Sequence, residues 1–143
     1  MTRGIRIAKK WDDDIIQLTF EVCDGLSLFI NTAYVATDWL ATVSSALRVF
    51  GEQIHGGLYD LEAGEFGPEY ASGGFFARFH FPKPGRLFVS THQQSNYREF
   101  KGTKVASEAR LFLTSEPVLL DRFIEELDAL NRDEREDATL ECT

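Results

Sequence analysis

The sequence predicts an α+β domain in which an antiparallel β-sheet of about six strands carries two main α-helices on one face. Apolar and polar residues alternate on both sides of a Pro/Gly turn over 74–92, a pattern typical of two antiparallel strands joined by a hairpin. A second alternation covers 16–30. Two further segments, 38–54 and 116–130, repeat apolar residues at helical spacing.

The N-terminal part predicts an edge strand and then a hairpin. Residues 3–9 alternate weakly, as edge strands do. The turn of the hairpin is placed at Asp24-Gly25, a dipeptide that favours tight hairpin turns. On the return strand we expect Leu28 to face the core together with its apolar neighbours.

A helix should follow over 38–54. Thr37 or Asp38 suits its N-cap, and the Gly pair in His55-Gly56-Gly57 suits its end. Residues 58–62 then predict a short strand, and the Gly- and acid-containing stretch 63–73 predicts a loop.

The second half supplies the Phe-rich hairpin, a polar connection over 93–102 and a strand over 103–113. Pro117 opens the second helix in the first turn, where its missing N–H is harmless. We expect 1–130 to form a single α+β domain and the charged residues 131–143 to form a flexible tail. The residues expected to be buried together are Phe20, Leu28, Leu47, Phe50, Phe79, Leu111, Phe123 and Leu127.

Charge is distributed unevenly along these 143 residues, whose net charge is −8. Acids dominate 12–72 and 115–143, whereas bases dominate 1–11 and 73–114. The acidic balance argues against direct nucleic-acid binding, which needs cations, and favours a basic partner attracted over long range. Solubility alone is the other explanation of this charge.

The sequence predicts a cytoplasmic protein. No apolar run reaches the roughly 18 residues that a membrane span needs, and the first residues lack the apolar stretch of a signal peptide. Cys23 and Cys142 are too few for a disulfide framework, which fits a reducing compartment.

No segment carries a recognisable catalytic, metal or cofactor motif, so the chain is expected not to be an enzyme. The Gly pairs match neither a phosphate-binding loop nor a dinucleotide fingerprint, and no G-x-S-x-G accompanies His55-Gly56-Gly57. No two of His55, His80 and His92 are spaced as ligands on one helix. The stretch from Phe75 to Phe88 could stack on single strands, but core packing explains its Phe residues better.

The stretch 59–70 is the predicted partner-binding segment. Aromatic side chains anchor many protein interfaces, and acids around them select a basic partner. The residues predicted to bind are Tyr59, Asp60, Glu62, Glu65, Phe66, Glu69 and Tyr70. An ordinary surface loop is the alternative.

The order of these elements resembles the small bacterial immunity proteins of the WapI type, which neutralise the C-terminal toxins of polymorphic or contact-dependent systems. The resembling features are the hairpin 16–30, the helix 39–54, the hairpin 74–91, the strand 105–113 and the closing helix with Leu120, Phe123 and Leu127. The resemblance implies a non-enzymatic inhibitor that binds one cognate toxin domain. Many such toxins are basic nucleases, which an acidic inhibitor would suit.

Two alternatives stay open: a small-ligand or regulatory binding module, and an enzyme whose residues converge only in the fold. A pocket of several hundred Å³ lined by polar groups would favour either of them. A convex acidic surface with aromatic side chains and no pocket would favour the inhibitor.

Overall fold

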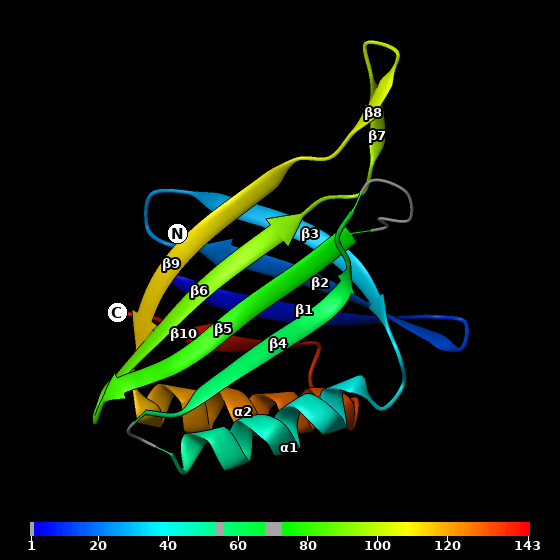
Figure 1. Cartoon of the computed structure of the whole chain (residues 1–143). Coiled ribbons are helices and arrows are strands. Elements are labelled where there is room, and N and C mark those ends of the chain that lie inside the picture. Colours follow the sequence, from blue (N-terminus) through cyan, green and yellow to red (C-terminus); the bar gives the residue numbers. More distant parts are fainter. Residues whose placement is uncertain (1, 54–55, 68–72) are drawn as a thin grey trace.

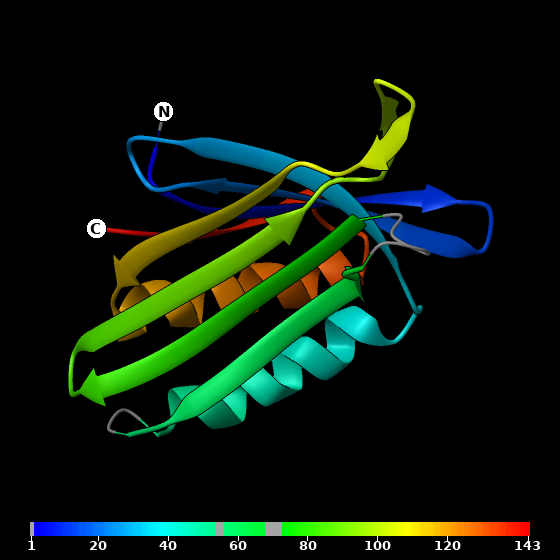
Figure 2. The ribbon, with the colours of Figure 1, turned by 45° about the horizontal axis from the view of Figure 1, so that its top comes forward.

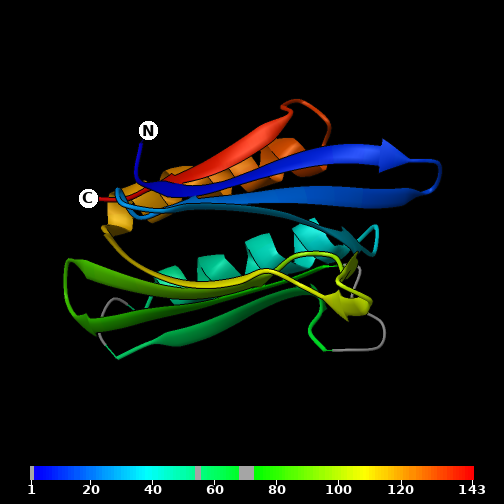
Figure 3. The same cartoon turned by 90° about the horizontal axis from the view of Figure 1, so that it is seen from above.

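Two four-stranded antiparallel sheets form separate layers, and two helices run along one side of both (Figures 1 and 3). The computed structural model describes residues 2–53, 56–67 and 73–143. The first sheet has the strand order β10-β1-β2-β3, and the second has the order β4-β5-β6-β9. The strands of the first sheet are β1 (Gly4–Asp12), β2 (Ile15–Cys23), β3 (Leu28–Val35) and β10 (Asp137–Glu141).

The strands of the second sheet are β4 (Leu58–Glu65), β5 (Gly73–Lys83), β6 (Arg86–Gln94) and β9 (Glu108–Ser115). A small hairpin of β7 (Arg98–Phe100) and β8 (Thr103–Val105) projects away from both sheets between β6 and β9 (Figure 2). Helix α1 (Trp39–Gly51) contacts β4, and helix α2 (Pro117–Asn131) contacts β10. The helices also pack on each other, so they bridge the edges of the two sheets.

The α+β class and its antiparallel pairing are confirmed, but the strands form two main sheets instead of one. The predicted hairpin over 74–92 is β5 and β6. Both helices occur close to their predicted spans, and Pro117 does begin α2. Ile54 and His55, predicted to end the first helix, lie outside the described residues.

The core lies where the two sheets and the helices meet. Phe20 of the first sheet stacks on Phe75 of the second, with ring centroids 4.2 Å apart. Phe50 of α1 stacks on Phe81 at 4.8 Å. Seven of the eight predicted core residues are buried in this cluster: Phe20, Leu47, Phe50, Phe79, Leu111, Phe123 and Leu127.

The prediction for Leu28 was wrong, because its side chain is 40% exposed. The hairpin loop spans Asp24 to Ser27, and Leu28 pairs with Cys23. Asn31 pairs with the buried Phe20, and cross-strand partners share a face of the sheet, so Asn31 faces the core. Successive side chains of a strand alternate between its faces, so Leu28 and Ile30 lie on the opposite, outward face.

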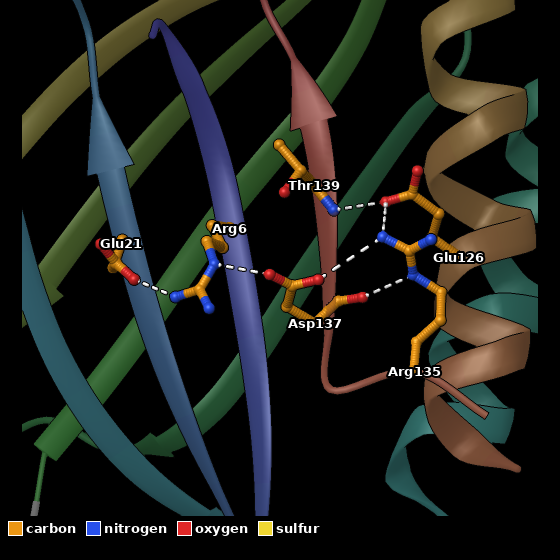
Figure 4. A network of polar contacts seen from close by, with 6 residues as sticks. All are labelled: Arg6, Glu21, Glu126, Arg135, Asp137 and Thr139. Carbon is orange, nitrogen blue, oxygen red and sulfur yellow. Dashed lines mark hydrogen bonds and ion pairs between the residues drawn. The ribbon is translucent and has the colours of Figure 1, made fainter. Parts of the chain in front are cut away.

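The expectation of a flexible tail over 131–143 is also corrected, because β10 pairs along β1 and buries Ala138 and Leu140 completely. Short apolar alternation within this charged segment is enough to complete the sheet. Arg6 of β1 bonds Glu21 and also donates to Asp137 at 2.8 Å (Figure 4). Glu126 of α2 accepts from the Thr139 backbone N–H at 2.9 Å, which fastens the strand to the helix.

Lys9 fixes the end of α2 to the first sheet. Its Nζ donates to the carbonyl oxygens of Leu130 and Asn131 at 3.2 and 3.3 Å and lies 2.9 Å from Asp133. Carbonyls at a helix C-terminus lack partners within the helix, and a cation there also meets the negative end of the dipole. The lysine side chain is only 3% exposed, so its charge is held by these acceptors.

The two sheets approach most closely where β3 crosses the start of β5. Gly73 has φ +126°, and a Cβ there would lie 2.0 Å from the Thr32 carbonyl oxygen. The Asn31 side-chain amide donates to the Gly74 carbonyl at 3.1 Å. Only glycine allows this backbone-to-backbone approach.

Candidate functional site

The predicted binding segment 59–70 is largely an edge strand rather than a loop, because β4 continues to Glu65. Strand alternation divides its side chains between two faces. Tyr59 lies on the inner side, where its ring contacts Phe50 and Phe79 at centroid distances of 6.5 and 6.2 Å. Burial, with a smaller contribution from the charge of Glu62, raises the pKa of Tyr59.

Asp60 lies on the outer side but is already paired. The Arg78 guanidinium donates to both of its carboxylate oxygens, Nε to Oδ1 at 2.8 Å and Nη2 to Oδ2 at 2.9 Å. These hydrogen bonds lower the pKa of Asp60 and raise that of Arg78. A partner that used Asp60 would therefore have to compete with a bidentate ion pair.

Glu62, Glu65 and Phe66 are exposed at the end of β4, and we call them the β4 edge site. The Phe66 ring stacks on His92 of β6, with centroids 4.5 Å apart and planes 14° from parallel. His92 in turn lies 2.8 Å from Glu108, Nε2 to Oε1. Glu69 and Tyr70, the other predicted residues, lie outside the described part of the chain.

A shallow hollow of about 280 Å³ joins the β4 edge site to the outer face of the second sheet. Glu62 and Phe66 line it together with Phe76 and His92. The structure thus brings together two predicted residues and two that sequence reasoning missed. Phe76 alternates with core residues in the sequence, and this alternation was the signal that it faces outward.

The same outer face carries two more exposed aromatic side chains, Phe88 on β6 and Phe112 on β9, which are 44% and 71% exposed. Phe88 pairs with Thr114 and Phe112 pairs with Ser90. The two rings are therefore diagonal neighbours on adjacent strands. Sequence reasoning assigned the Phe residues from Phe75 to Phe88 to packing, which holds for Phe75, Phe79 and Phe81 but not for Phe88.

An open hollow of about 530 Å³ lies over these two rings, and we call it the sheet-face hollow. Phe88 and Phe112 line it with Arg3, Arg78, His80 and Asp24, among others. Its volume is in the range of small-molecule sites. The sequence analysis named a pocket of this size with a polar lining as a feature that would favour either a ligand-binding module or an enzyme, and this hollow has polar residues in its lining beside the two rings.

The remaining candidate groups do not assemble into a catalytic or metal constellation within the described ranges. His80 pairs with Phe88 and His92 with Phe76, so the two histidines are not cross-strand partners. Among the described residues, no three His, Cys, Asp or Glu side chains are placed to hold one metal ion. Burial raises the pKa of the Cys142 thiol to about 12, which keeps it protonated at neutral pH. No helix in the described part of the chain is long and apolar enough to cross a membrane.

Comparison with known proteins found one similar solved chain, in a structure titled "CdiA-CT/CdiI toxin and immunity complex from Enterobacter cloacae". The two chains are 9% identical and superpose with a TM-score of 0.49, over 90% of this chain and 99% of that one. No protein-family model and no curated protein matches the sequence. These comparisons therefore assign the chain to no family.

Proposed function

We propose that this protein binds a basic protein partner through the β4 edge site and that the partner is a cognate toxin domain, which binding neutralises. The proposal follows the sequence resemblance to bacterial immunity proteins and the predicted segment 59–70. It makes the chain a non-enzymatic inhibitor. The nuclease activity expected of the partner belongs to the same proposal.

The observation that carries it is an aromatic anchor held in place beside two exposed acids. Phe66 is 38% exposed, and its stacking on His92 restricts its motion before any partner arrives. A side chain ordered in advance loses less entropy on binding. Glu62 and Glu65 form no ion pair with any described residue, so their carboxylates are available to lysine or arginine.

Charge supports a basic partner for this edge. Among the described residues, the only ion pair on β4 joins Asp60 to Arg78. The other two carboxylates of this edge strand, those of Glu62 and Glu65, form no such pair. Such exposed interfacial charges govern the encounter rate more than the final affinity. Encounter should therefore be fast at low salt and slower as salt screens the charges.

The test is co-expression with the C-terminal domain encoded by a large open reading frame adjoining the gene. The intact protein should restore growth and co-purify with that domain. The double variant Glu62→Lys/Glu65→Lys should slow association about tenfold or more at low salt and weaken protection of the cells. Phe66→Ala should instead speed dissociation, because it removes an anchor rather than a charge.

A matched control is Asp121→Lys/Glu125→Lys, which makes the same change of charge on exposed positions of α2. It should associate at a rate much closer to that of the unmodified protein. Melting curves of all variants should agree within a few degrees, since these positions are exposed. Equal slowing in both double variants would show that net charge, and not the β4 edge site, steers the partner. No rescue by the unmodified protein would refute the immunity role.

A further inference from the structure

We propose that the sheet-face hollow is a binding site for a nucleoside phosphate, with the base over Phe88 and Phe112 and the phosphate held by arginine. This site lies apart from the β4 edge site and goes beyond the proposed function. It rests on three features of the outer face: an aromatic floor, hydroxyl groups beside it, and guanidinium groups on two sides.

The floor is set by the register of three strands. Across β5, β6 and β9, one row reads His80, Phe88, Thr114. The next row reads Arg78, Ser90, Phe112. The two phenyl rings are thus diagonal neighbours, roughly 7–8 Å apart in backbone terms, which is within reach of aromatic side chains. Neither ring stacks on another aromatic ring among the described residues, and the exposed parts of both offer a stacking surface.

Hydroxyl groups alternate with these rings. Ser90 and Thr114 both line the hollow, and each lies directly across from one of the phenylalanines. Thr114 Oγ1 donates to the Thr143 carbonyl at 3.0 Å, so its lone pairs remain able to accept. A sugar has the complementary hydroxyl donors, which an alkyl or aryl ligand lacks.

The two arginines that line the hollow come from opposite sides of the floor, and the Arg3 side chain lies against Gly25. Arg78 is on β5, next to the strand that carries Phe88. Arg3 is on the far side of β9, because residues 142–143 run beside that strand: the Thr143 N–H donates to the Thr114 carbonyl at 2.9 Å, and the Cys142 N–H donates to the Arg3 carbonyl at 3.2 Å. A ligand over the phenyl rings therefore meets an arginine in either direction.

The charged side chains at the hollow sum to zero, because Arg3 and Arg78 are matched by Asp24, which also lines the hollow, and by Asp60, which pairs with Arg78. Directed hydrogen bonds from the guanidinium groups, and not an excess of positive charge, would therefore hold an anion there. Asp24 accepts the backbone N–H groups of Leu26 and Ser27, and these bonds lower its pKa. Asp60 occupies Nε and Nη2 of Arg78, whereas Nη1 makes no hydrogen bond to a described residue and can donate to phosphate.

A nucleoside monophosphate combines these requirements in one molecule: a planar base, a hydroxylated sugar and a small anion. An aromatic side chain gives a base a surface to stack on, and arginine holds phosphate with directed hydrogen bonds. Inorganic phosphate would use only the guanidinium groups, and a nucleoside only the floor. The whole molecule should bind more tightly than either part.

The experiment is isothermal titration calorimetry of the intact protein with AMP, GMP, CMP and UMP, and with adenosine and inorganic phosphate as the two parts. We expect saturable binding of at least one nucleotide with a stoichiometry of one. Phe112→Ala should weaken it about tenfold or more. Arg3→Ala should weaken nucleotide binding while leaving nucleoside binding within about twofold.

Phe100→Ala is the matched control, because this phenylalanine is 54% exposed on the projecting hairpin, away from the hollow. It should leave the dissociation constant unchanged. No heat from any of the four nucleotides at millimolar concentration would overturn the proposal. So would unchanged binding by Phe112→Ala, or equal affinity for phosphate alone, since each would show that the aromatic floor is not used.

Discussion

Replacing Leu140 with alanine tests whether the last strand is an integral part of the fold. Leu140 is completely buried and pairs with Ile5, one position from the end of the β1–β10 ladder. The substitution removes three buried carbon atoms. At about 0.8 kcal/mol for each, the transfer loss is roughly 2.4 kcal/mol, and the cavity that remains adds to it. We expect the free energy of unfolding to fall by about 2–5 kcal/mol.

Leu26→Ala is the matched control, because it makes the same chemical change at a side chain that is 95% exposed. Its effect should stay within about 0.5 kcal/mol. Urea denaturation should be followed by circular dichroism and by the fluorescence of Trp11 and Trp39, with coincident transitions supporting a two-state analysis. A loss below about 1 kcal/mol for Leu140→Ala would show that β10 is not docked, and the segment 131–143 would then be the flexible tail that its composition predicts.

Two further predictions concern the polar contacts that hold the sheets. Lys9→Met should lower the free energy of unfolding by about 1–3 kcal/mol, because two helix-terminal carbonyls and Asp133 lose a buried donor. The control Lys10→Met, at the exposed neighbouring position, should lower it by less than about 0.5 kcal/mol. Equal losses of stability in the two variants would contradict the capping role of Lys9. The pKa of Asp60 is lowered by its hydrogen bonds with Arg78, so this ion pair stabilises the protein above the unfolded pKa of about 3.9 and its contribution is lost as pH falls through the lower folded value. The stability difference between the unmodified protein and Asp60→Asn should therefore shrink in urea titrations between about pH 5 and 2. A constant difference over that range would exclude the coupling.

Local patterns in the sequence predict the elements of this fold well. Alternation around a Pro/Gly turn predicts β5 and β6, and helical stripes predict α1 and α2 within a few residues. These patterns depend only on neighbours along the chain. The division into two sheets depends instead on which strands pair, and here β1 recruits β10 across more than 120 residues. No local pattern encodes that pairing.

The glycines at the crossing of the sheets show the same limit. In the sequence, Gly64 and Gly73 fall in the predicted loop 63–73, and Gly74 begins the predicted hairpin. In the fold, Gly64 has φ +69° and a Cβ there would lie 2.1 Å from the Gly73 carbonyl oxygen, while Gly73 abuts the backbone of β3. These glycines are needed for close approach rather than for flexibility. Sequence composition cannot distinguish the two uses, because both require only the absence of a side chain.

The sequence predicts the acidic character of the β4 edge site, but not which of its carboxylates are free of ion pairs with the described residues. The acids of segment 59–70 are visible in the sequence, yet only the structure shows that Asp60 is paired across the ladder with Arg78. Cross-strand partners share a face, so the register of β4 on β5 decides which acid is neutralised. The same register leaves Glu62 opposite Phe76, an apolar residue that offers no counter-charge. The exposed Glu62 and the outward, half-buried ring of Phe76 are therefore consequences of one pairing.

The sheet-face hollow depends on register to an even greater degree. Alternation identifies Phe76 as outward-facing, but it cannot place Phe88 and Phe112 side by side. The connection from Gln94 to Glu108 includes a separate hairpin, so its length does not reveal the register of β9 on β6. A shift of β9 by two residues would keep every core residue on its face and yet move Phe112 opposite His92 or Phe88. Burial on the inner face of the sheet decides only which side chains of β9 face inward. The loop length and the pairing of Val89 with Leu113 fix the register of β9 on β6. The core therefore specifies the fold, and the exact offset of one edge strand specifies whether an aromatic floor exists.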